Sequence, residues 1–182
     1  MKFEPTYGKL KNGKTVLIRN CEIQDAAKLL KSVKQQIADS IYIPKTEEEF
    51  TLTEEQEKKW ISSFMVASNS LLLVAEYEDE IIGNIDLTGH TRKIMQHTAV
   101  IGMGMLLDYR NMGLGQLLLK GAIHWAKQNP QLELLWLQVY TENHLGVSLY
   151  KKMGFEENGI LKNYFKQDGR YYDNLTMSLV VK

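Results

Sequence analysis

The sequence contains a single cysteine, Cys21, so no disulfide bond can form within the chain. It also lacks internal repeats and Pro- or Ser-rich linkers, with only three prolines in 182 residues. A chain of this length can bury a sizeable apolar core. We therefore expect one domain over residues 1–182, with its core from about residue 15 to about residue 180.

Neither sign of charge is in excess, because lysine plus arginine and aspartate plus glutamate each total 22. This balance gives no basic surface for nucleic acid. No apolar run approaches 18 residues, and the N-terminus has no apolar signal segment. We expect a cytoplasmic protein that binds neither nucleic acid nor membranes.

Hydrophobic periodicity predicts a mixed α/β fold in the order βααβββαβαββ. The sheet is expected to be mostly antiparallel and flanked by helices. Residues 132–140 are almost all apolar, which is typical of a strand buried on both faces. Expected helices cover residues 23–39, 53–67, 113–128 and 143–153, and expected strands cover residues 15–19, 71–77, 81–88, 97–107, 132–140, 155–166 and 171–181.

The most informative stretch runs from residue 100 to residue 119, where an apolar strand, a turn with two glycines and an amphipathic helix follow one another. The turn has the spacing Arg110-x-x-Gly113-x-Gly115. Free N–H groups at a helix N-terminus, with no side chain above them, can bind an anion. The stretch therefore predicts a site for a phosphate group.

Other phosphate- and metal-binding motifs are excluded. Leu107 and Leu118 stand where a dinucleotide fingerprint requires its third glycine, and no Gly-Lys-Ser/Thr sequence is present. The four histidines have no metal-ligand spacing. We expect no metal ion.

About 30 residues further on, residues 143–155 read Asn-His-Leu-Gly-Val-Ser-Leu-Tyr-Lys-Lys-Met-Gly-Phe. The first motif resembles the coenzyme A pyrophosphate loop of the GNAT N-acetyltransferases, and the second resembles that family's Asn-x-x-Ala-x-x-Leu-Tyr-x-Lys-x-Gly-Phe signature. Gly146 departs from the family's alanine. The resemblance covers roughly residues 15–180. It implies the GNAT fold and an acetyl-CoA-dependent N-acetyltransferase.

The resemblance also implies which residues bind acetyl-CoA. Backbone groups of the turn would hold the pyrophosphate. The strand before the turn would diverge from residues 132–140, so that backbone groups of Met105, Leu106 and Leu107 pair with the pantetheine arm. Asn143 would contact the arm or cap its helix. The turn residues are Arg110, Asn111, Met112, Gly113, Leu114, Gly115 and Gln116.

Direct attack of an amine on the thioester, through a tetrahedral intermediate, expels a thiolate. By resemblance, Tyr150 faces the sulfur. A phenol has a higher pKa than a thiol and would be protonated, so Tyr150 is the expected acid. The alternative is a core tyrosine.

No carboxylate occurs at positions 100–104, where some GNAT enzymes place a glutamate base. Asp86 on the neighbouring strand is the first candidate for the catalytic base, and His97 is the second. A water relay, or an amine that loses its proton without a protein base, is equally compatible with the sequence. The missing glutamate also leaves open a non-catalytic acyl-CoA-binding module.

The acceptor is expected to be a primary amine of a small molecule or peptide. Residues 39–52 and the turn between the last two strands are expected to select it, because such loops vary on a fixed scaffold. The closing hairpin leaves a homodimer open.

Overall fold

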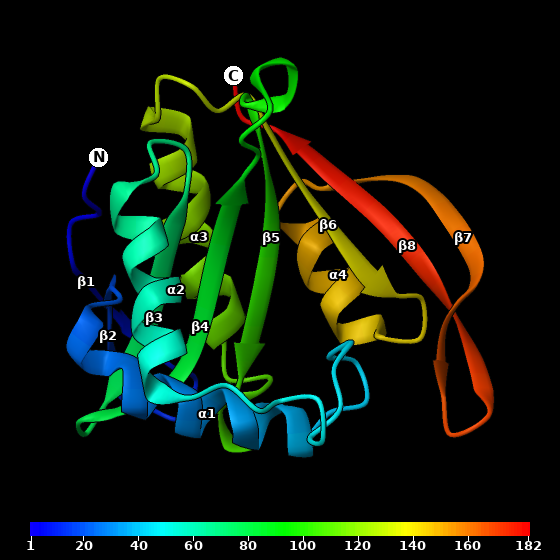
Figure 1. Cartoon of the computed structure of the whole chain (residues 1–182), viewed down its shortest axis with the longest axis horizontal. Coiled ribbons are helices and arrows are strands. Elements are labelled where there is room, and N and C mark those ends of the chain that lie inside the picture. Colours follow the sequence, from blue (N-terminus) through cyan, green and yellow to red (C-terminus); the bar gives the residue numbers. More distant parts are fainter.

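A computed structural model describes all 182 residues and contains one eight-stranded sheet in the order β1-β2-β3-β4-β5-β6-β8-β7 (Figure 1). All neighbouring strands are antiparallel except β5 and β6. The strands are β1 (Thr6–Lys9), β2 (Thr15–Asn20), β3 (Leu71–Tyr77), β4 (Glu80–Gly89), β5 (Thr98–Met105), β6 (Leu134–Tyr140), β7 (Glu156–Gln167) and β8 (Arg170–Val180). The helices are α1 (Ala26–Ala38), α2 (Glu54–Val66), α3 (Leu114–Gln128) and α4 (His144–Lys152).

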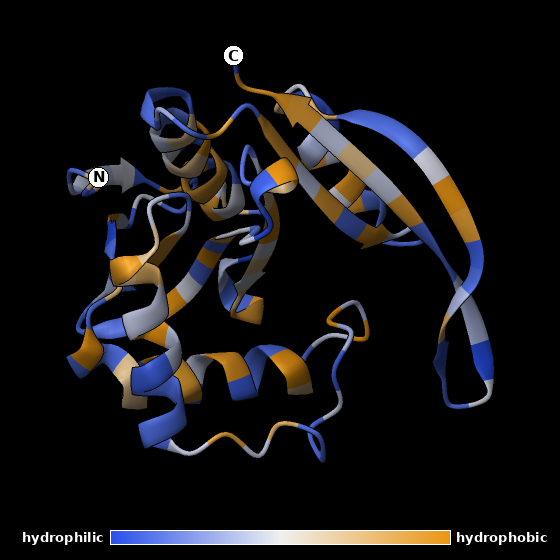
Figure 2. Ribbon diagram, turned by 45° about the horizontal axis from the view of Figure 1, so that its top comes forward, coloured by the Kyte–Doolittle hydropathy of each residue, from blue (hydrophilic) through white to orange (hydrophobic).

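The helices pack against both faces of the sheet and form an apolar core on each face. Side chains of α1 and α2, such as Leu29 and Ile61, pack with Val74 on one face. Side chains of α3, such as Leu118, pack with Ile85 on the other face, where α4 also lies. The central strands and α3 are mainly hydrophobic, whereas the β7–β8 hairpin projects from the body with a hydrophilic tip (Figure 2). Alternate residues of each central strand thus enter opposite cores.

The expected α/β fold class is confirmed. Thr53 accepts a hydrogen bond from the Gln56 backbone, and the Gln56 side chain returns one to the Thr53 backbone, so α2 begins at the expected capping box. Strand β1 was not predicted, because its four mostly exposed residues show no apolar alternation.

The expectation that residues 132–140 are buried on both faces is wrong. Leu135, Leu137 and Val139 are buried, whereas Trp136 is half-buried and Gln138 is exposed. The reason is that α3 and α4 lie on the same face of the sheet. No helix covers the opposite face of β6, which borders the candidate site described below.

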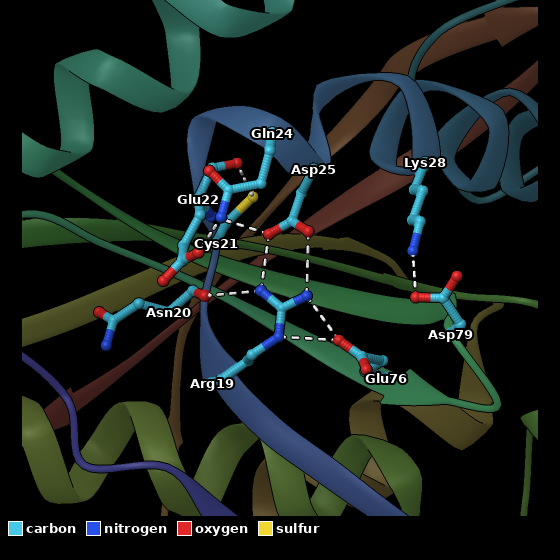
Figure 3. Close-up of polar contacts among 9 residues, drawn as sticks. All are labelled: Arg19, Asn20, Cys21, Glu22, Gln24, Asp25, Lys28, Glu76 and Asp79. Atoms are coloured by element: carbon cyan, nitrogen blue, oxygen red, sulfur yellow. Dashed lines mark hydrogen bonds and ion pairs between the residues drawn. The ribbon is translucent and has the colours of Figure 1, made fainter.

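A partly buried ion network fixes the start of α1 against the sheet (Figure 3). The Arg19 guanidinium lies 2.6 Å from an Asp25 carboxylate oxygen and 2.5 Å from one of Glu76. Burial alone would raise the pKa of Asp25, but Arg19 and the Glu22 N–H outweigh it and hold that pKa below its ordinary value. The neighbouring Cys21 is buried, which raises the pKa of its thiol. Cys21 is therefore a core residue and not a nucleophile.

Replacing Arg19 with methionine should lower the free energy of unfolding by about 3–5 kcal/mol, because it leaves the Asp25 carboxylate buried without its cation. Urea denaturation at pH 7 measures the loss. Lys28→Met is the matched control, since the Lys28–Asp79 pair is exposed and should contribute little. The lowered pKa of Asp25 also predicts how stability depends on pH. The stabilisation by this carboxylate is present at neutral pH and is lost as pH falls below about 4. An Arg19→Met chain as stable as the Lys28→Met chain would contradict this role.

Candidate active site

Strands β5 and β6 pair over only three residues and then diverge. The last parallel pair is Val100 with Trp136, although β5 continues to Met105. The Leu106 N–H donates to the Ile82 carbonyl on β4. Because backbone groups alternate along a strand, Met103 and Met105 turn their N–H and C=O groups the other way, into the split. Backbone groups at an unpaired strand edge can bind an extended ligand.

The Gly113 turn leads directly from the open end of this split into α3. Asn111 and Gly113 have φ values of 60° and 93°, and no side chain caps the helix. Leu117 is the first residue whose N–H bonds back to the Gly113 carbonyl, at 3.1 Å. The N–H groups of Leu114, Gly115 and Gln116 therefore remain free for an anion.

The two glycines of the turn have different physical roles. A Cβ atom added to Gly113 would meet nothing within 4 Å, so the space above this residue is open. A Cβ on Gly115 would lie 2.9 Å from side-chain carbons of both Leu149 and Met105. Gly113 gives the backbone its left-handed conformation, whereas Gly115 lets α4 and β5 pack against the start of α3.

The other expected turn residues are partly engaged within the protein. Arg110 donates from Nε to the Met105 carbonyl at 3.3 Å and from Nη1 to the Asp39 carbonyl at 3.0 Å. The Met112 carbonyl accepts from the Lys11 N–H. Arg110 thus fastens the turn to the ends of β5 and α1.

Most backbone polar groups of Leu106 and Leu107 are engaged within the protein. The Leu106 N–H is bonded to β4, and the carbonyls of Leu106 and Leu107 accept from the N–H groups of Tyr109 and Arg110. Met103, which is not among the predicted cofactor-binding residues, occupies the second position in the split. The alternation of strand residues is the signal that could have identified it.

Asn143 caps α4, because its Oδ1 accepts from the Gly146 N–H at 3.0 Å. This confirms one of its two expected roles. A Cβ on Gly146 would lie 2.8–3.0 Å from the Asn143 carboxamide. Alanine at position 146, as in the family motif, would therefore require the Asn143 carboxamide to shift.

Tyr150 lies on α4 with its ring edge-on to Phe155, at 5.8 Å between centroids. Its hydroxyl makes no hydrogen bond with the protein, and burial raises its pKa to about 12. The hydroxyl is therefore protonated at neutral pH and free to donate.

Asp86 lies across the ladder from Gly102, the first residue on that face of β5 beyond the last pair with β6. Its Oδ1 is 2.5 Å from the position of a Cβ on Gly102, so the absent side chain gives the carboxylate its space. Burial raises the Asp86 pKa to about 6, against a hydrogen bond from the Thr88 hydroxyl at 2.9 Å. A carboxyl with this pKa can accept a proton near neutral pH.

His97 is exposed and immediately precedes β5, at the paired end of the split. The fold does not bring it to the site. No three His, Cys, Asp or Glu side chains come together as metal ligands, and no helix is long and apolar enough to cross a membrane.

Of the two segments expected to select the acceptor, residues 39–52 reach β6 through an aromatic ring. The Tyr42 hydroxyl, in the α1–α2 connection, donates to the Glu142 carbonyl at 3.2 Å. The Tyr42 ring lies edge-on to Tyr140, which stacks on Phe165 of β7 at 3.8 Å. Selection of the acceptor by these segments stays a prediction.

Comparison with known proteins agrees with this geometry. Residues 18–176 match the family model for the acetyltransferase (GNAT) domain. An N-alpha-acetyltransferase of Sulfurisphaera tokodaii is 24% identical over 159 residues, covering 87% of this chain and 91% of that protein. The chain belongs to the GNAT family and is an N-acetyltransferase.

Two solved structures have the same fold. The acetyltransferase of the GNAT family from Streptococcus pneumoniae superimposes with a TM-score of 0.88 at 29% identity, covering 91% of this chain and 99% of that one. The structure of yncA from Salmonella typhimurium with its cofactor acetyl-CoA superimposes with a TM-score of 0.82 at 16% identity, covering 92% of this chain and 94% of that one.

Proposed function

We propose that this protein transfers the acetyl group of acetyl-CoA to a primary α-amine, with Asp86 as base and Tyr150 as acid. The observation that carries the proposal is the split between β5 and β6, which has the Asp86 carboxyl at its closed end and the Gly113 turn at its open end. An α-amine acceptor is supported by the relative from Sulfurisphaera tokodaii, an N-alpha-acetyltransferase.

The residues of the split fit coenzyme A. The free N–H groups after Gly113 and the positive end of the α3 dipole suit the pyrophosphate. Met103 and Met105 offer the backbone edge along which an extended pantetheine arm can pair. Bound in this way, acetyl-CoA supplies the thioester carbon that the amine attacks.

The roles proposed for Asp86 and Tyr150 follow from which protons must move during the reaction. Deprotonating an α-amine with a pKa near 8 at pH 7 costs about 1 kcal/mol, whereas deprotonating a lysine-type amine costs about 4–5 kcal/mol. As the C–N bond forms and the C–S bond breaks, the amine proton goes to Asp86. The departing thiolate takes a proton from Tyr150. Asp86 then releases its proton to solvent, and solvent returns a proton to Tyr150. Both groups hold the protonation state that this step needs at neutral pH.

Tyr150→Phe should lower kcat about 10–100-fold, because the thiolate loses its proton donor while the ring contact with Phe155 is kept. The dissociation constant of coenzyme A, measured by calorimetry, should change less than about twofold. Loss of coenzyme A affinity with an unchanged rate per bound enzyme would instead assign Tyr150 to binding.

Thiol release from acetyl-CoA tests the function directly. The acceptor panel comprises peptides, amino acids, polyamines and aminoglycosides. Turnover with α-amines at pH 7 is the expected result, with mass spectrometry locating the acetyl group on the amine. Coenzyme A binding without turnover across the panel would support a non-catalytic acyl-CoA-binding module instead.

A further inference from the structure

Two polar side chains lie over glycine residues on the α1–α2 face of β5, beside the split. Gly102 and Gly104 are successive residues on this face and pair with Asp86 and Asn84 of β4. The Asp86 carboxylate lies over Gly102. The Gln36 carboxamide of α1 lies over Gly104, with its Oε1 only 1.9 Å from the position of a Cβ there. The two glycines therefore form a floor that a hydrogen-bond acceptor borders at each end.

Gln36 is rigidly held, although only one end of its carboxamide is engaged. The residue is 2% exposed, and its Nε2 donates to Ser32 Oγ and Asn84 Oδ1, both at 3.1 Å. Its Oε1 accepts no hydrogen bond from the protein and is not fully enclosed. A fixed, reachable acceptor of this kind selects for a donor.

The spacing of the two glycines beneath these oxygens suits two donors better than one. Successive same-face residues on a strand are about 7 Å apart. A single tetrahedral nitrogen with two hydrogen bonds of 2.9 Å spans only about 4.7 Å. In a peptide, the terminal nitrogen and the next amide nitrogen are about 3 Å apart, so their two hydrogen bonds can reach across the floor. A free amino acid would instead turn its carboxylate toward these oxygens.

We propose that the acceptor is a peptide N-terminus rather than a free amino acid, and that Gln36 selects it by accepting the amide N–H that follows the reacting amine. This inference rests on the proposed function, because it assumes that the reacting amine lies beside Asp86. Gln36 is then a specificity-determining residue that touches the acceptor.

N-methylation of one amide removes the proposed donor and nothing else that is polar. The acceptors are tripeptide amides that begin with Gly, Ala, Ser or Met, the same peptides methylated at the second nitrogen, and the free amino acids. For the wild-type protein, kcat/KM should fall at least 10-fold on N-methylation and at least 100-fold for the free amino acid. In Gln36→Met, the parent peptide should fall to the level of its methylated analogue, so that their ratio approaches 1.

Ser32→Ala is the matched control, because it removes one bond that holds Gln36 and keeps the Oε1 acceptor. It should preserve most of the methylation effect. A steric effect of the methyl group would persist in Gln36→Met and would overturn the role of Gln36. Equal rates on parent and methylated peptides, or preference for free amino acids, would also overturn the inference while leaving the proposed function intact. Failure to acetylate any amine would overturn the proposed function itself.

Discussion

Gly113→Val is expected to weaken coenzyme A binding at least 100-fold, a loss of about 2.7 kcal/mol. Gly113 has a φ of 93° and nothing above it within 4 Å, so the valine side chain would fill the space through which an anion reaches the first N–H groups of α3. A β-branched residue also resists this left-handed conformation. Calorimetric titration with coenzyme A measures the effect.

Gly169→Val separates blockage of the site from backbone strain. Gly169 has a φ of 78°, also has open space around it, and lies in the β7–β8 turn. Each substitution should cost about 1–3 kcal/mol of stability. Only Gly113→Val should lose coenzyme A affinity. Wild-type affinity in a folded Gly113→Val chain would refute the pyrophosphate site.

Asp86→Asn is expected to lower kcat/KM for an α-amine about 100-fold at pH 7, within the usual range for loss of a general base. In the wild-type protein the rate should rise with pH through an apparent pKa near 6, in addition to the titration of the amine. That limb should disappear in Asp86→Asn. Its persistence would assign the base to another group or to water.

The same substitution should increase stability, which distinguishes loss of the base from misfolding. The unfolded Asp86 carboxyl ionises near pH 4 and the folded one near pH 6. Between these values the folded chain binds more protons, so the wild-type protein loses stability as pH rises through this window. At pH 8, Asp86→Asn should therefore be about 1–3 kcal/mol more stable than the wild-type protein, and the gain should disappear near pH 4. Urea denaturation at the two pH values measures it.

Thr88→Val tests the assignment of Asp86 by changing the pKa of its carboxyl without removing it. The Thr88 hydroxyl donates to Asp86 Oδ2 and holds the pKa of that carboxyl below the value that burial alone would give. Removing the donor should move the acid limb of the rate to higher pH with little change in the maximal rate. An unmoved limb would argue against titration of Asp86.

Local patterns in the chain were sufficient to predict the fold class and the glycine turn. The spacing Arg110-x-x-Gly113-x-Gly115 predicts a strand, a tight turn and a helix because glycine conformation and helix ends are properties of short segments. The capping box at Thr53 and the alternation in β8 are equally local. Such features are encoded within a few residues, so they can be recognised without knowing the tertiary contacts.

The arrangement of the site was decided by tertiary contacts. Asp86 could be named as a candidate base, but its position over Gly102 and its raised pKa depend on strand register and burial. Gln36 could not be found at all, because α1 brings it to β4 from 48 residues away in the chain. The open face of β6 likewise depends on which side α4 packs. Amino-acid order therefore determined the glycine turn at the start of α3, whereas only the folded sheet brought Asp86 and Gln36 together beside the split, because their contacts join residues that no short pattern links.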